Sequence, residues 1–206
     1  MEIKLKTDSR KVIDGDTFIA IPNVERDGHD FIPDAIKNGA KKIIAEKGNY
    51  EVKTEIVPST REYLNNYLYK NYYPKFKNMK LIGVTGTNGK TTTCYLIFQM
   101  LKLLNKRSGY IGTIGFYYGD EKRLLNNTTP DIDLLYSMFL EAKENKCKYM
   151  VMEVSSHALD MNRVYGLSFD EVAFTNLTQD HLDYHKTLEN YMAAKKILFS
   201  KTRSKK

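Results

Sequence analysis

The spacing of apolar and polar positions divides this 206-residue chain into two parts. Residues 1 to 78 hold short apolar runs separated by polar turns, which is typical of short mixed elements. From residue 79 onward, buried-type apolar runs alternate with longer helical patterns. That alternation predicts a mostly parallel sheet with helices on both faces. The pattern therefore predicts an α/β protein, with a small mixed α/β N-terminal domain at 1–78 and a second domain at 79–206.

Individual elements follow from β-branched apolar runs, which favour strands, and from the helical spacing of large apolar residues. In the first domain the expected elements are strands 17–21 and 42–45, helices 32–38 and 61–72, and a linker at 74–79. In the second domain they are strands 81–84, 149–154 and 171–174, a glycine-interrupted, strand-like run at 110–118, and helices 91–104, 131–145 and 188–200. Asp131 is expected to cap its helix or to lie in the first turn.

Composition allows a sizeable core, since 42% of the residues are hydrophobic and 12% are aromatic. The charged fraction of 28% and the mean hydropathy of −0.49 argue against a disordered chain and against an integral membrane protein. No apolar stretch approaches the ~18 residues that span a bilayer, and the first six residues lack a signal-peptide pattern. Cys94 and Cys147 are too few for a disulfide framework or a zinc site. We therefore expect a cytoplasmic protein with no membrane partner.

The net charge is +7, but four of the positive charges lie in the last six residues. The rest of the chain is only mildly basic, which is a weak argument for nucleic-acid binding. A solvated basic tail accounts for the surplus better. We therefore expect no nucleic-acid partner.

The strongest chemical signal is the run Gly83-Val-Thr-Gly-Thr-Asn-Gly-Lys-Thr-Thr-Thr93, which leaves an expected strand and opens an expected helix. Glycines let consecutive backbone N–H groups point at a phosphate, and the helix N-terminus adds a favourable dipole. Lys90 can then reach the β- and γ-phosphates, and the Thr91 hydroxyl can bind Mg²⁺. The general P-loop pattern has a glycine where this chain has Val84, so a glycine-rich turn with an incidental lysine is the alternative. The strand before the loop and the helix after it favour nucleotide binding.

An acid at the end of an apolar run is the second signal. Glu153 ends the run that starts at Tyr149, and burial of a carboxylate is unfavourable unless it is paired or binds a metal. A P-loop enzyme needs a second metal ligand at the end of a neighbouring strand, which favours metal binding. The alternative is an acid that caps the following turn through Ser155 or Ser156.

Two histidines and two aspartates lie within six residues, in Asp180-His-Leu-Asp-Tyr-His185. Such ligands suit zinc as well as Mg²⁺ or Mn²⁺. A polar turn that starts a helix, with Asp180 or Asp183 as its cap, fits the spacing equally well. Farther along, Lys195 shares a helix face with Tyr191. Spacing alone favours a lysine whose stem packs on that face while its amine reaches solvent.

Together these motifs resemble the Mur ligase family of ATP-dependent amide-forming enzymes, over residues 5 to 200. Within the family, they are most similar to the members that add the third residue to the muramoyl peptide. Four groups of motifs carry the likeness: Thr7-Asp-Ser-Arg10 with Gly15-Asp16-Thr-Phe18 and Asp27-Gly28; Gly86-Thr-Asn-Gly-Lys-Thr91; Asn127-Thr-Thr129 with Glu153-Val-Ser-Ser-His157 and Arg163-Val164; and Thr175-Asn176 through His185 with Ala193-Ala-Lys195.

The resemblance implies a role for each matching residue. ATP would be bound by Gly86, Thr87, Asn88, Gly89, Lys90, Thr91 and Thr92. Two Mg²⁺ sites would be formed by Thr91, Glu153, His181 and Lys195. Lys195 would bind the ion as a carbamate formed with CO₂. This role replaces the interpretation from spacing, in which the Lys195 amine reaches solvent. The catalytic residues would be Lys90, His181 and Lys195. The uracil and ribose end of a UDP-sugar would contact Thr7, Ser9 and Arg10, with Val24 to Arg26 nearby. The sugar-peptide part would contact Asn127, Thr128, Thr129, Ser155 and Arg163.

The implied activity belongs to peptidoglycan precursor synthesis. ATP would phosphorylate the D-glutamate side-chain carboxylate of UDP-N-acetylmuramoyl-L-alanyl-D-glutamate, and the amine of a diamino acid would attack the acyl phosphate. Mg²⁺ and Lys90 would offset the charge that accumulates. Family members are longer and carry a third domain, so a truncated, monomeric ligase is expected. The alternative is a catalytically incompetent module that binds the nucleotide or the UDP-sugar.

Overall fold

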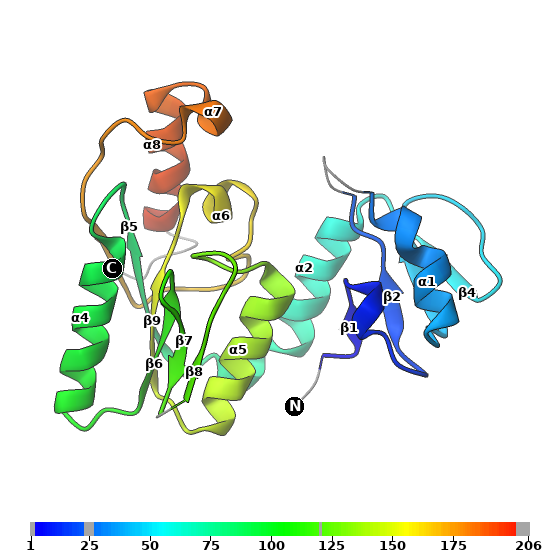
Figure 1. Cartoon of the computed structure of the whole chain (residues 1–206), viewed down its shortest axis with the longest axis horizontal. Helices are drawn as coiled ribbons and strands as arrows, with labels where there is room; N and C mark the ends of the chain where they lie inside the picture. The colour runs from blue at the N-terminus through cyan, green and yellow to red at the C-terminus, as the bar shows by residue number, and fades with distance from the viewer. Residues whose placement is uncertain (1–2, 23–26, 120, 201–206) are drawn as a thin grey trace. The chain divides into compact units, whose positions relative to one another are not determined.

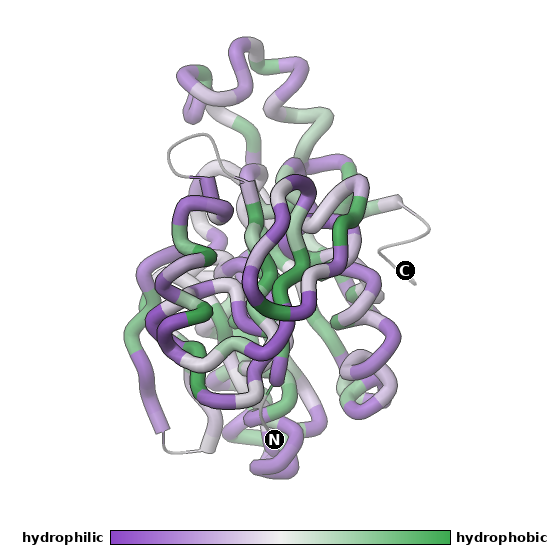
Figure 2. The backbone as a smooth tube through the Cα atoms, turned by 90° about the vertical axis from the view of Figure 1, so that its right-hand side faces the viewer, coloured by the Kyte–Doolittle hydropathy of each residue, from purple (hydrophilic) through white to green (hydrophobic). Residues whose placement is uncertain are grey.

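The computed structural model describes residues 3–22, 27–119 and 121–200. Two compact units make up the chain, Met1–Asn71 and Tyr72–Lys206. Helices and strands are interspersed in both (Figure 1), and hydrophobic stretches are short and interrupted by hydrophilic turns (Figure 2). Among the helices in the described ranges, none has the length and apolar character needed to cross a membrane.

The first unit is a parallel sheet with short helices, and it confirms the expected mixed α/β class. Its strands follow one another in the order β1 (Leu5–Lys6), β2 (Thr17–Ile19), β3 (Lys42–Ala45) and β4 (Lys53–Ile56). Its helices are the 3-10 turns Ser9–Lys11 and Gly28–Phe31, α1 (Ile32–Lys37) and α2 (Thr60–Asn71). Phe18, Ala35 and Ile43 are buried in one core cluster, which joins α1 to the sheet.

The second unit contains a six-stranded, mostly parallel sheet. Its strands, in spatial order, are β10 (Glu171–Phe174), β5 (Lys80–Thr85), β9 (Tyr149–Glu153), β6 (Ser108–Gly112), β7 (Gly115–Tyr118) and β8 (Glu121–Arg123). The first four run parallel, and the last two are antiparallel additions. The parallel core confirms the expected doubly covered α/β architecture.

Helices cover both sides of this sheet, and Figure 1 shows α4 and α5 on opposite sides. The helices are α3 (Tyr73–Phe76), α4 (Lys90–Leu103), α5 (Ile132–Glu144), α6 (Ser156–Asp160), α7 (Leu182–His185) and α8 (Leu188–Lys196), followed by a 3-10 turn at Ile197–Phe199. Cys94 and Phe98 of α4 pack with Val84, Tyr110 and Val151 of the strands in one buried cluster.

The glycine-interrupted, strand-like run expected at 110–118 is two strands rather than one. The chain reverses between Gly112 and Gly115, and β6 pairs with β7 in an antiparallel hairpin. Gly115 has a φ of 127°, a conformation that residues with a Cβ rarely adopt. The apolar pattern on both sides of this turn is continuous, so the glycines were the only available signal of the reversal.

The linker expected at 74–79 is wrong for its first half, which belongs to α3. Pro74 occupies a first-turn position of this helix, where proline is favourable because its missing N–H needs no partner. Phe76, only 1% exposed, stacks on Phe139 of α5 with ring centres 5.0 Å apart. Tyr136 meets the same ring edge-on at 5.3 Å. The segment is therefore part of the core.

Replacing Phe76 by alanine should lower the free energy of unfolding by about 3–5 kcal/mol, because it removes a buried ring and leaves a cavity. Urea unfolding followed by circular dichroism measures the loss. The control is Leu103→Ala, since Leu103 is 82% exposed and should change stability by no more than about 0.5 kcal/mol. Equal, small effects of the two substitutions would contradict a core position for Phe76.

Candidate nucleotide-binding and catalytic site

The carboxyl ends of β5, β9 and β10 meet at one edge of the second sheet. The parallel registers pair Val84 with Glu153 and Thr85 with Phe174. The segments that follow these three strands therefore begin side by side. In parallel α/β sheets this is the edge at which ligands bind.

The glycine-rich turn between β5 and α4 has the backbone that a phosphate loop needs. Gly89 is the N-cap of α4 with a φ of 83°, and Gly86 has a φ of 149°. Both values lie where a side chain introduces strain. A Cβ on Gly86 would also overlap the Thr175 hydroxyl. Because α4 starts directly after the turn, its dipole favours an anion there.

The segment after β10 holds this turn in place. The Thr87 N–H donates to the Asn176 carbonyl at 2.9 Å, and the Asn88 N–H donates to the Asn176 side-chain oxygen at 3.0 Å. The Thr175 hydroxyl donates to the Asn88 carbonyl at 2.6 Å. Two amides of the turn are thus paired within the protein. The turn is fixed from a strand far away in the sequence.

Two lysine amines converge on one carbonyl of the turn. Lys90 donates to the carbonyls of Gly86 at 2.9 Å and Thr87 at 2.8 Å, and Lys195 donates to that of Gly86 at 2.8 Å. Lys195 is 1% exposed, and its amine lies 4.2 Å from the centre of the Tyr191 ring. The interpretation in which its amine reaches solvent is therefore wrong, because α8 presents this face to the loop.

Burial changes the acidity of both amines. Burial, together with the positive charge of Lys90, lowers the pKa of Lys195 to about 8. Burial also lowers the pKa of Lys90, although the carboxylates of Glu153 and Asp180 oppose that shift. Two adjacent amines in a poorly solvated site attract a polyanion more strongly than they would in water.

Glu153 is completely buried and is surrounded by donors. Its Oε2 accepts from the hydroxyls of Thr91 at 2.9 Å and Thr113 at 3.2 Å. Its Oε1 accepts from the Thr113 N–H at 2.9 Å and from the Tyr110 hydroxyl. These hydrogen bonds explain how the fold tolerates a carboxylate here. They also bring Glu153 and Thr91 together, as the sequence predicted.

The helix after β9 does not depend on Glu153 for its cap. Ser155 is the N-cap of α6, and its hydroxyl accepts from the Ala158 N–H at 3.2 Å. This cap leaves the Glu153 carboxylate directed at the loop side of the sheet edge. The capping alternative for Glu153 is therefore wrong.

Tyr110 and Thr113 were missed by the sequence reasoning. Thr113 is the first polar residue after β6, so the rule that ligands bind at the carboxyl ends of strands was a signal for it. Tyr110 meets Glu153 because β6 pairs with β9, and the sequence does not show that pairing. A Cβ on Gly112 would overlap the Glu153 carboxylate and the Tyr110 hydroxyl, which explains the glycine.

The residues predicted for the sugar-peptide part adjoin the same acid. The Thr129 hydroxyl donates to the Glu153 carbonyl at 2.9 Å and accepts from the Ser155 N–H at 3.0 Å. The hydroxyls of Thr128 and Thr113 lie 3.0 Å apart. A continuous set of polar contacts therefore joins the predicted substrate residues to the predicted metal ligand.

Arg163 joins this group from the segment after α6. Its Nη1 donates to the Thr129 carbonyl at 3.0 Å, and its Nε lies 3.0 Å from the Asp131 carboxylate. Asp131 is the N-cap of α5 in position, but its side chain makes no capping hydrogen bond. Asn127 and Thr92 are both exposed. Thr92 lies on the first turn of α4.

The described contacts of His181 do not include Thr91 or Glu153. It is the N-cap of α7 with a φ of 51°, so neither Asp180 nor Asp183 holds the cap position. Its ring centre is 4.8 Å from that of His157 and 6.0 Å from that of Tyr191. Within residues 3–22, 27–119 and 121–200, no three His, Cys, Asp or Glu side chains are grouped closely enough to hold a metal ion.

The predicted UDP-sugar residues lie in the first unit. Asp8 is the N-cap of the turn Ser9–Lys11 and pairs with Arg10 at 2.8 Å, which lowers the pKa of the Asp8 carboxyl. Ser9 is buried, Thr7 is half-buried and Arg10 is exposed. Residues 24–26, which were expected nearby, lie outside the described residues.

A glycine-rich loop between a buried strand and a helix, on a parallel sheet, defines a P-loop-type α/β protein. The chain belongs to the Mur ligase family. The model of the Mur ligase middle domain matches residues 84–206, and the model named Mur ligase family, catalytic domain, matches residues 4–81. Together the two matches span nearly the whole chain.

Individual relatives agree with this assignment. The UDP-N-acetylmuramoyl-L-alanyl-D-glutamate--2,6-diaminopimelate ligase of Oceanobacillus iheyensis is 44% identical over 199 residues, which are 95% of this chain and 40% of the relative. The ligase 1 of the same name from Clostridium acetobutylicum is 45% identical over 205 residues, 97% of this chain and 42% of the relative. The chain thus spans about two fifths of the length of these relatives.

Solved structures give the same result. A ligase with the same name, UDP-N-acetylmuramoyl-L-alanyl-D-glutamate--2,6-diaminopimelate ligase, matches with a TM-score of 0.79 and 32% identity, over 95% of this chain and 40% of that one. The MurF ligase from Thermotoga maritima in complex with ADP matches with a TM-score of 0.66 and 27% identity. The match covers 96% of this chain and 44% of that one.

The buried amine of Lys195 should make stability depend on pH. Its pKa is about 8 in the folded chain and ordinary in the unfolded chain, so between pH 8 and 10 the unfolded state binds more protons. Stability therefore rises with pH in this window, by up to about 1.4 kcal/mol per pH unit. Lys195→Met should abolish this contribution in urea unfolding at pH 7, 8, 9 and 10.

The matched control is Lys196→Met, because Lys196 is the exposed neighbour on the same helix. Its stability should follow that of the unmodified chain at each pH. If Lys195→Met and Lys196→Met show the same pH dependence, Lys195 does not carry a lowered pKa.

Proposed function

We propose that this chain forms the UDP-muramoyl-peptide-binding and ATP-binding parts of an ATP-dependent ligase that adds a diamino acid to UDP-N-acetylmuramoyl-L-alanyl-D-glutamate. The first would be residues 1–78 and the second residues 79–206. One observation carries the proposal. The buried Glu153 carboxylate accepts from the first hydroxyl of the P-loop helix, that of Thr91, at 2.9 Å. The names of the relatives support diaminopimelate as the diamino acid.

The turn residues fit the phosphates of ATP. Gly86 and Gly89 hold a backbone that a Cβ would strain, and the amines of Lys90 and Lys195 lie at the same turn. Polyphosphate would supply the negative charge that these amines lack as partners. Residues 86–92 would therefore bind the nucleotide, with Lys90 reaching its terminal phosphates.

The Thr91–Glu153 pair fits Mg²⁺. A hydroxyl and a carboxylate are hard oxygen ligands of the kind that this ion prefers, and the remaining Glu153 contacts are hydroxyls and an amide that orient the carboxylate. Mg²⁺ when bound offsets the negative charge of the phosphates. In the same site, Thr113 and Tyr110 hold Glu153 in position. We propose His181 and Lys195 as ligands of a second ion.

We propose that Lys195 reacts with CO₂ to form a carbamate, as the family resemblance implies. The neutral amine attacks the carbon of CO₂, and the N–H proton leaves to solvent, so an anion replaces a cation beside Lys90. The buried position of Lys195 on the Tyr191 ring supports this, because water has little access to the group. The lowered pKa of Lys195 gives a larger neutral fraction.

For the muramoyl peptide, the supporting feature is the group around Glu153. Thr128, Thr129, Ser155 and Arg163 lie within one set of contacts, and Asn127 is adjacent in sequence. They would orient the D-glutamate carboxylate for phosphoryl transfer from ATP, and Lys90 would offset the developing charge. Thr7, Ser9 and Arg10 would hold the UDP end. The amine of the diamino acid would then attack the acyl phosphate and release phosphate.

Several further expectations belong with this function. UDP-linked sugars and ATP are soluble nucleotide substrates, so the ligase would act in the cytoplasm. It would act as a monomer, without a nucleic-acid or membrane partner.

Glu153→Gln should weaken binding of ATP in the presence of Mg²⁺ by roughly 10- to 100-fold, the range typical of groups that bind or orient a metal. Binding measured without Mg²⁺ should change much less, because the shape of the side chain is kept. Isothermal calorimetry with and without Mg²⁺ measures both. Glu141→Gln is the control, since Glu141 pairs with Tyr118 and Arg123 in the same unit. An equal loss with and without Mg²⁺ would contradict metal binding by Glu153.

Carbamate formation at Lys195 should give a ¹³C NMR signal when the protein is equilibrated with ¹³C-bicarbonate. The signal should be absent from Lys195→Met and present in Lys196→Met. A signal of equal size in both variants would place the modification elsewhere.

Calorimetric titration with ATP and with the UDP-muramoyl dipeptide, followed by a phosphate-release assay with diaminopimelate, separates an enzyme from a binding module. Binding of both ligands with phosphate release supports a self-sufficient ligase. Binding without release supports a module that binds the ligands but needs more of the ligase for turnover. Failure to bind either ligand would contradict the proposed function.

A further inference from the structure

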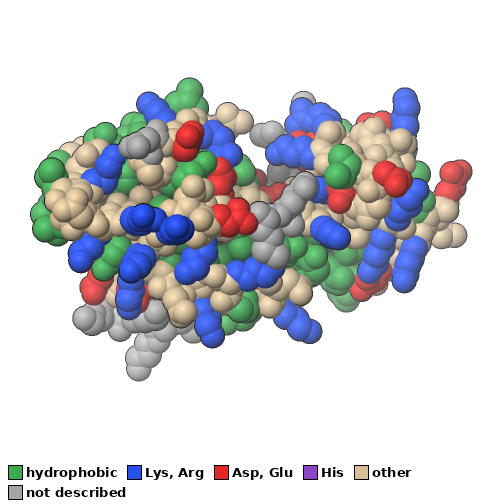
Figure 3. All heavy atoms as spheres, turned by 90° about the horizontal axis from the view of Figure 1, so that it is seen from below, with side chains coloured by type: hydrophobic (Ala, Val, Ile, Leu, Met, Phe, Trp, Pro, Cys, Tyr) green, Lys and Arg blue, Asp and Glu red, His purple; other side chains and the backbone are tan. Residues whose placement is uncertain are grey.

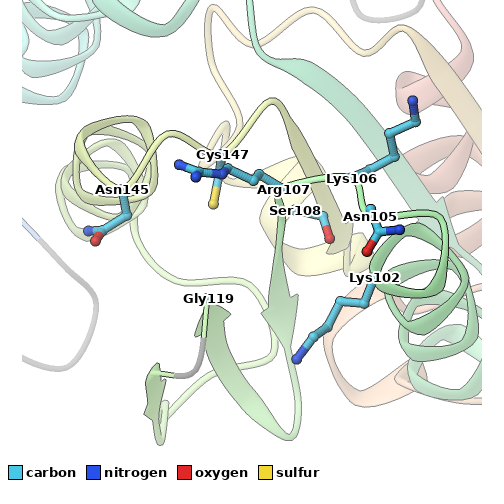
Figure 4. A pocket seen from close by; sticks show the side chains of 8 residues that line it. All are labelled: Lys102, Asn105, Lys106, Arg107, Ser108, Gly119, Asn145 and Cys147. Atoms are coloured by element: carbon cyan, nitrogen blue, oxygen red, sulfur yellow. The ribbon is translucent and has the colours of Figure 1, made fainter.

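A pocket lies at the amino end of the second sheet, opposite the edge that carries the phosphate loop. It has a volume of about 340 Å³, within the ~300–1,000 Å³ range of small-molecule sites. Figure 4 shows its lining arriving from the end of α4, the start of β6, the end of β7 and the end of α5. The lining consists of Lys102, Asn105, Lys106, Arg107, Ser108, Gly119, Asn145 and Cys147.

The lining is strongly cationic. Lys102, Lys106 and Arg107 contribute three positive charges, and the described residues of the lining include no acid. Lys102 lies over the Phe98 ring at 5.8 Å from its centre. None of the three cations has an ion pair with an acid in the described part of the chain. Figure 3, which shows this side of the molecule, has Lys and Arg side chains gathered here.

The floor of the pocket holds a polar group that lacks a partner. Ser108 is only 4% exposed, and among the described residues its hydroxyl has no hydrogen-bond partner. Buried hydroxyls are nearly always paired in proteins, because an unpaired one loses its bonds to water. A hydroxyl left without a partner at a cationic pocket is suited to donate to an oxygen of a bound anion.

The loops that border the pocket are held by backbone hydrogen bonds to the last turns of α4 and α5. Asn105 and Lys146 adopt positive φ values of 55° and 62° at the ends of α4 and α5. The Lys106 N–H donates to the Leu101 carbonyl, and the Cys147 N–H donates to the Ala142 carbonyl. The final carbonyls of both helices are thus capped by their own loops. The charge presented to a ligand comes from the side chains.

Cys147 also lines the pocket, in the loop after α5. The Lys148 N–H donates to the Arg107 carbonyl at 2.8 Å, which ties the loop after α4 to the loop after α5. Cys147 is 3% exposed. Burial raises the pKa of its thiol, and Arg107 opposes that shift. The thiol therefore stays protonated beside the cations and supplies no competing negative charge.

We propose that this pocket binds a small phosphate-bearing molecule, attracted by the positive charges of Lys102, Lys106 and Arg107. These exposed side chains extend in different directions in Figure 4 and would turn toward the phosphate, with the Ser108 hydroxyl as a further donor. Guanidinium and ammonium groups form short, charge-assisted hydrogen bonds to phosphate oxygens. The pocket is separate from the phosphate loop, because β6 begins at Ser108 whereas Gly86 follows the end of β5. Its ligand would therefore bind in addition to the proposed nucleotide.

Amide-resolved NMR with the full chain tests this proposal, using pyrophosphate and inorganic phosphate as probes. The amide signals of Ser108, Gly119 and Cys147 should shift in a saturable manner as pyrophosphate is added. They should do so equally in Lys90→Met, which weakens the phosphate loop. Readout by residue separates the two sites, so failure here and failure of the proposed function are distinguishable.

Arg107→Gln and Lys106→Gln should each weaken pyrophosphate binding at these signals by about tenfold or more, as expected for the loss of a charge-assisted hydrogen bond. Both side chains are exposed, so the fold should persist. Arg61→Gln, on α2, is the matched control and should leave the titration unchanged. Unshifted signals, shifts that grow linearly without saturation, or shifts that survive Arg107→Gln would overturn the proposal. A response to RNA or DNA oligomers but not to pyrophosphate would overturn it too.

Discussion

Burial of one carboxylate is the constraint on which the rest of the second unit depends. Glu153 has no access to water, and its free energy in the folded chain is acceptable only because four donors on three residues contact its carboxylate. Thr91 comes from the helix after the turn, and Tyr110 and Thr113 come from β6 and its end. Any change that moves one of these segments leaves the buried acid with fewer hydrogen bonds. The phosphate loop and β6 are thus positioned by the same group.

Charge at the sheet edge is organised in two layers. The acid lies beneath the loop, and the amines of Lys90 and Lys195 lie at the Gly86 carbonyl. Burial, and after it the positive charge of Lys90, lowers the pKa of Lys195 in the folded chain. Such an arrangement lowers stability while it keeps positive charge at the proposed nucleotide site, which is common at functional sites. The amino-end pocket has the same property, with three cations and an unpaired hydroxyl.

Three elements are predicted closely from the apolar pattern of the sequence. Strand 171–174 and strand 42–45 coincide with the structure, and the helix expected at 91–104 differs by one residue at each end. Short elements with few apolar residues, such as β1 and β4, carry too weak a pattern to predict. The β6–β7 reversal was missed because apolar residues continue across it. The first half of the supposed linker is helical because Phe76 finds a partner in α5, which no local pattern reveals.

The sequence by itself determined the class of the fold, the phosphate loop and the acid at the end of β9, because these depend on local spacing and on the parallel-sheet rule. The tertiary structure alone decided which of these side chains are buried and which partners they contact. Lys195 looks like a surface lysine in its own helix, but it is buried because α8 packs on a turn formed 109 positions earlier. Tyr110 and Thr113 join Glu153 through strand pairing, and Ser108 loses its partner through burial. Pairing and burial arise between distant segments, so no local pattern encodes them.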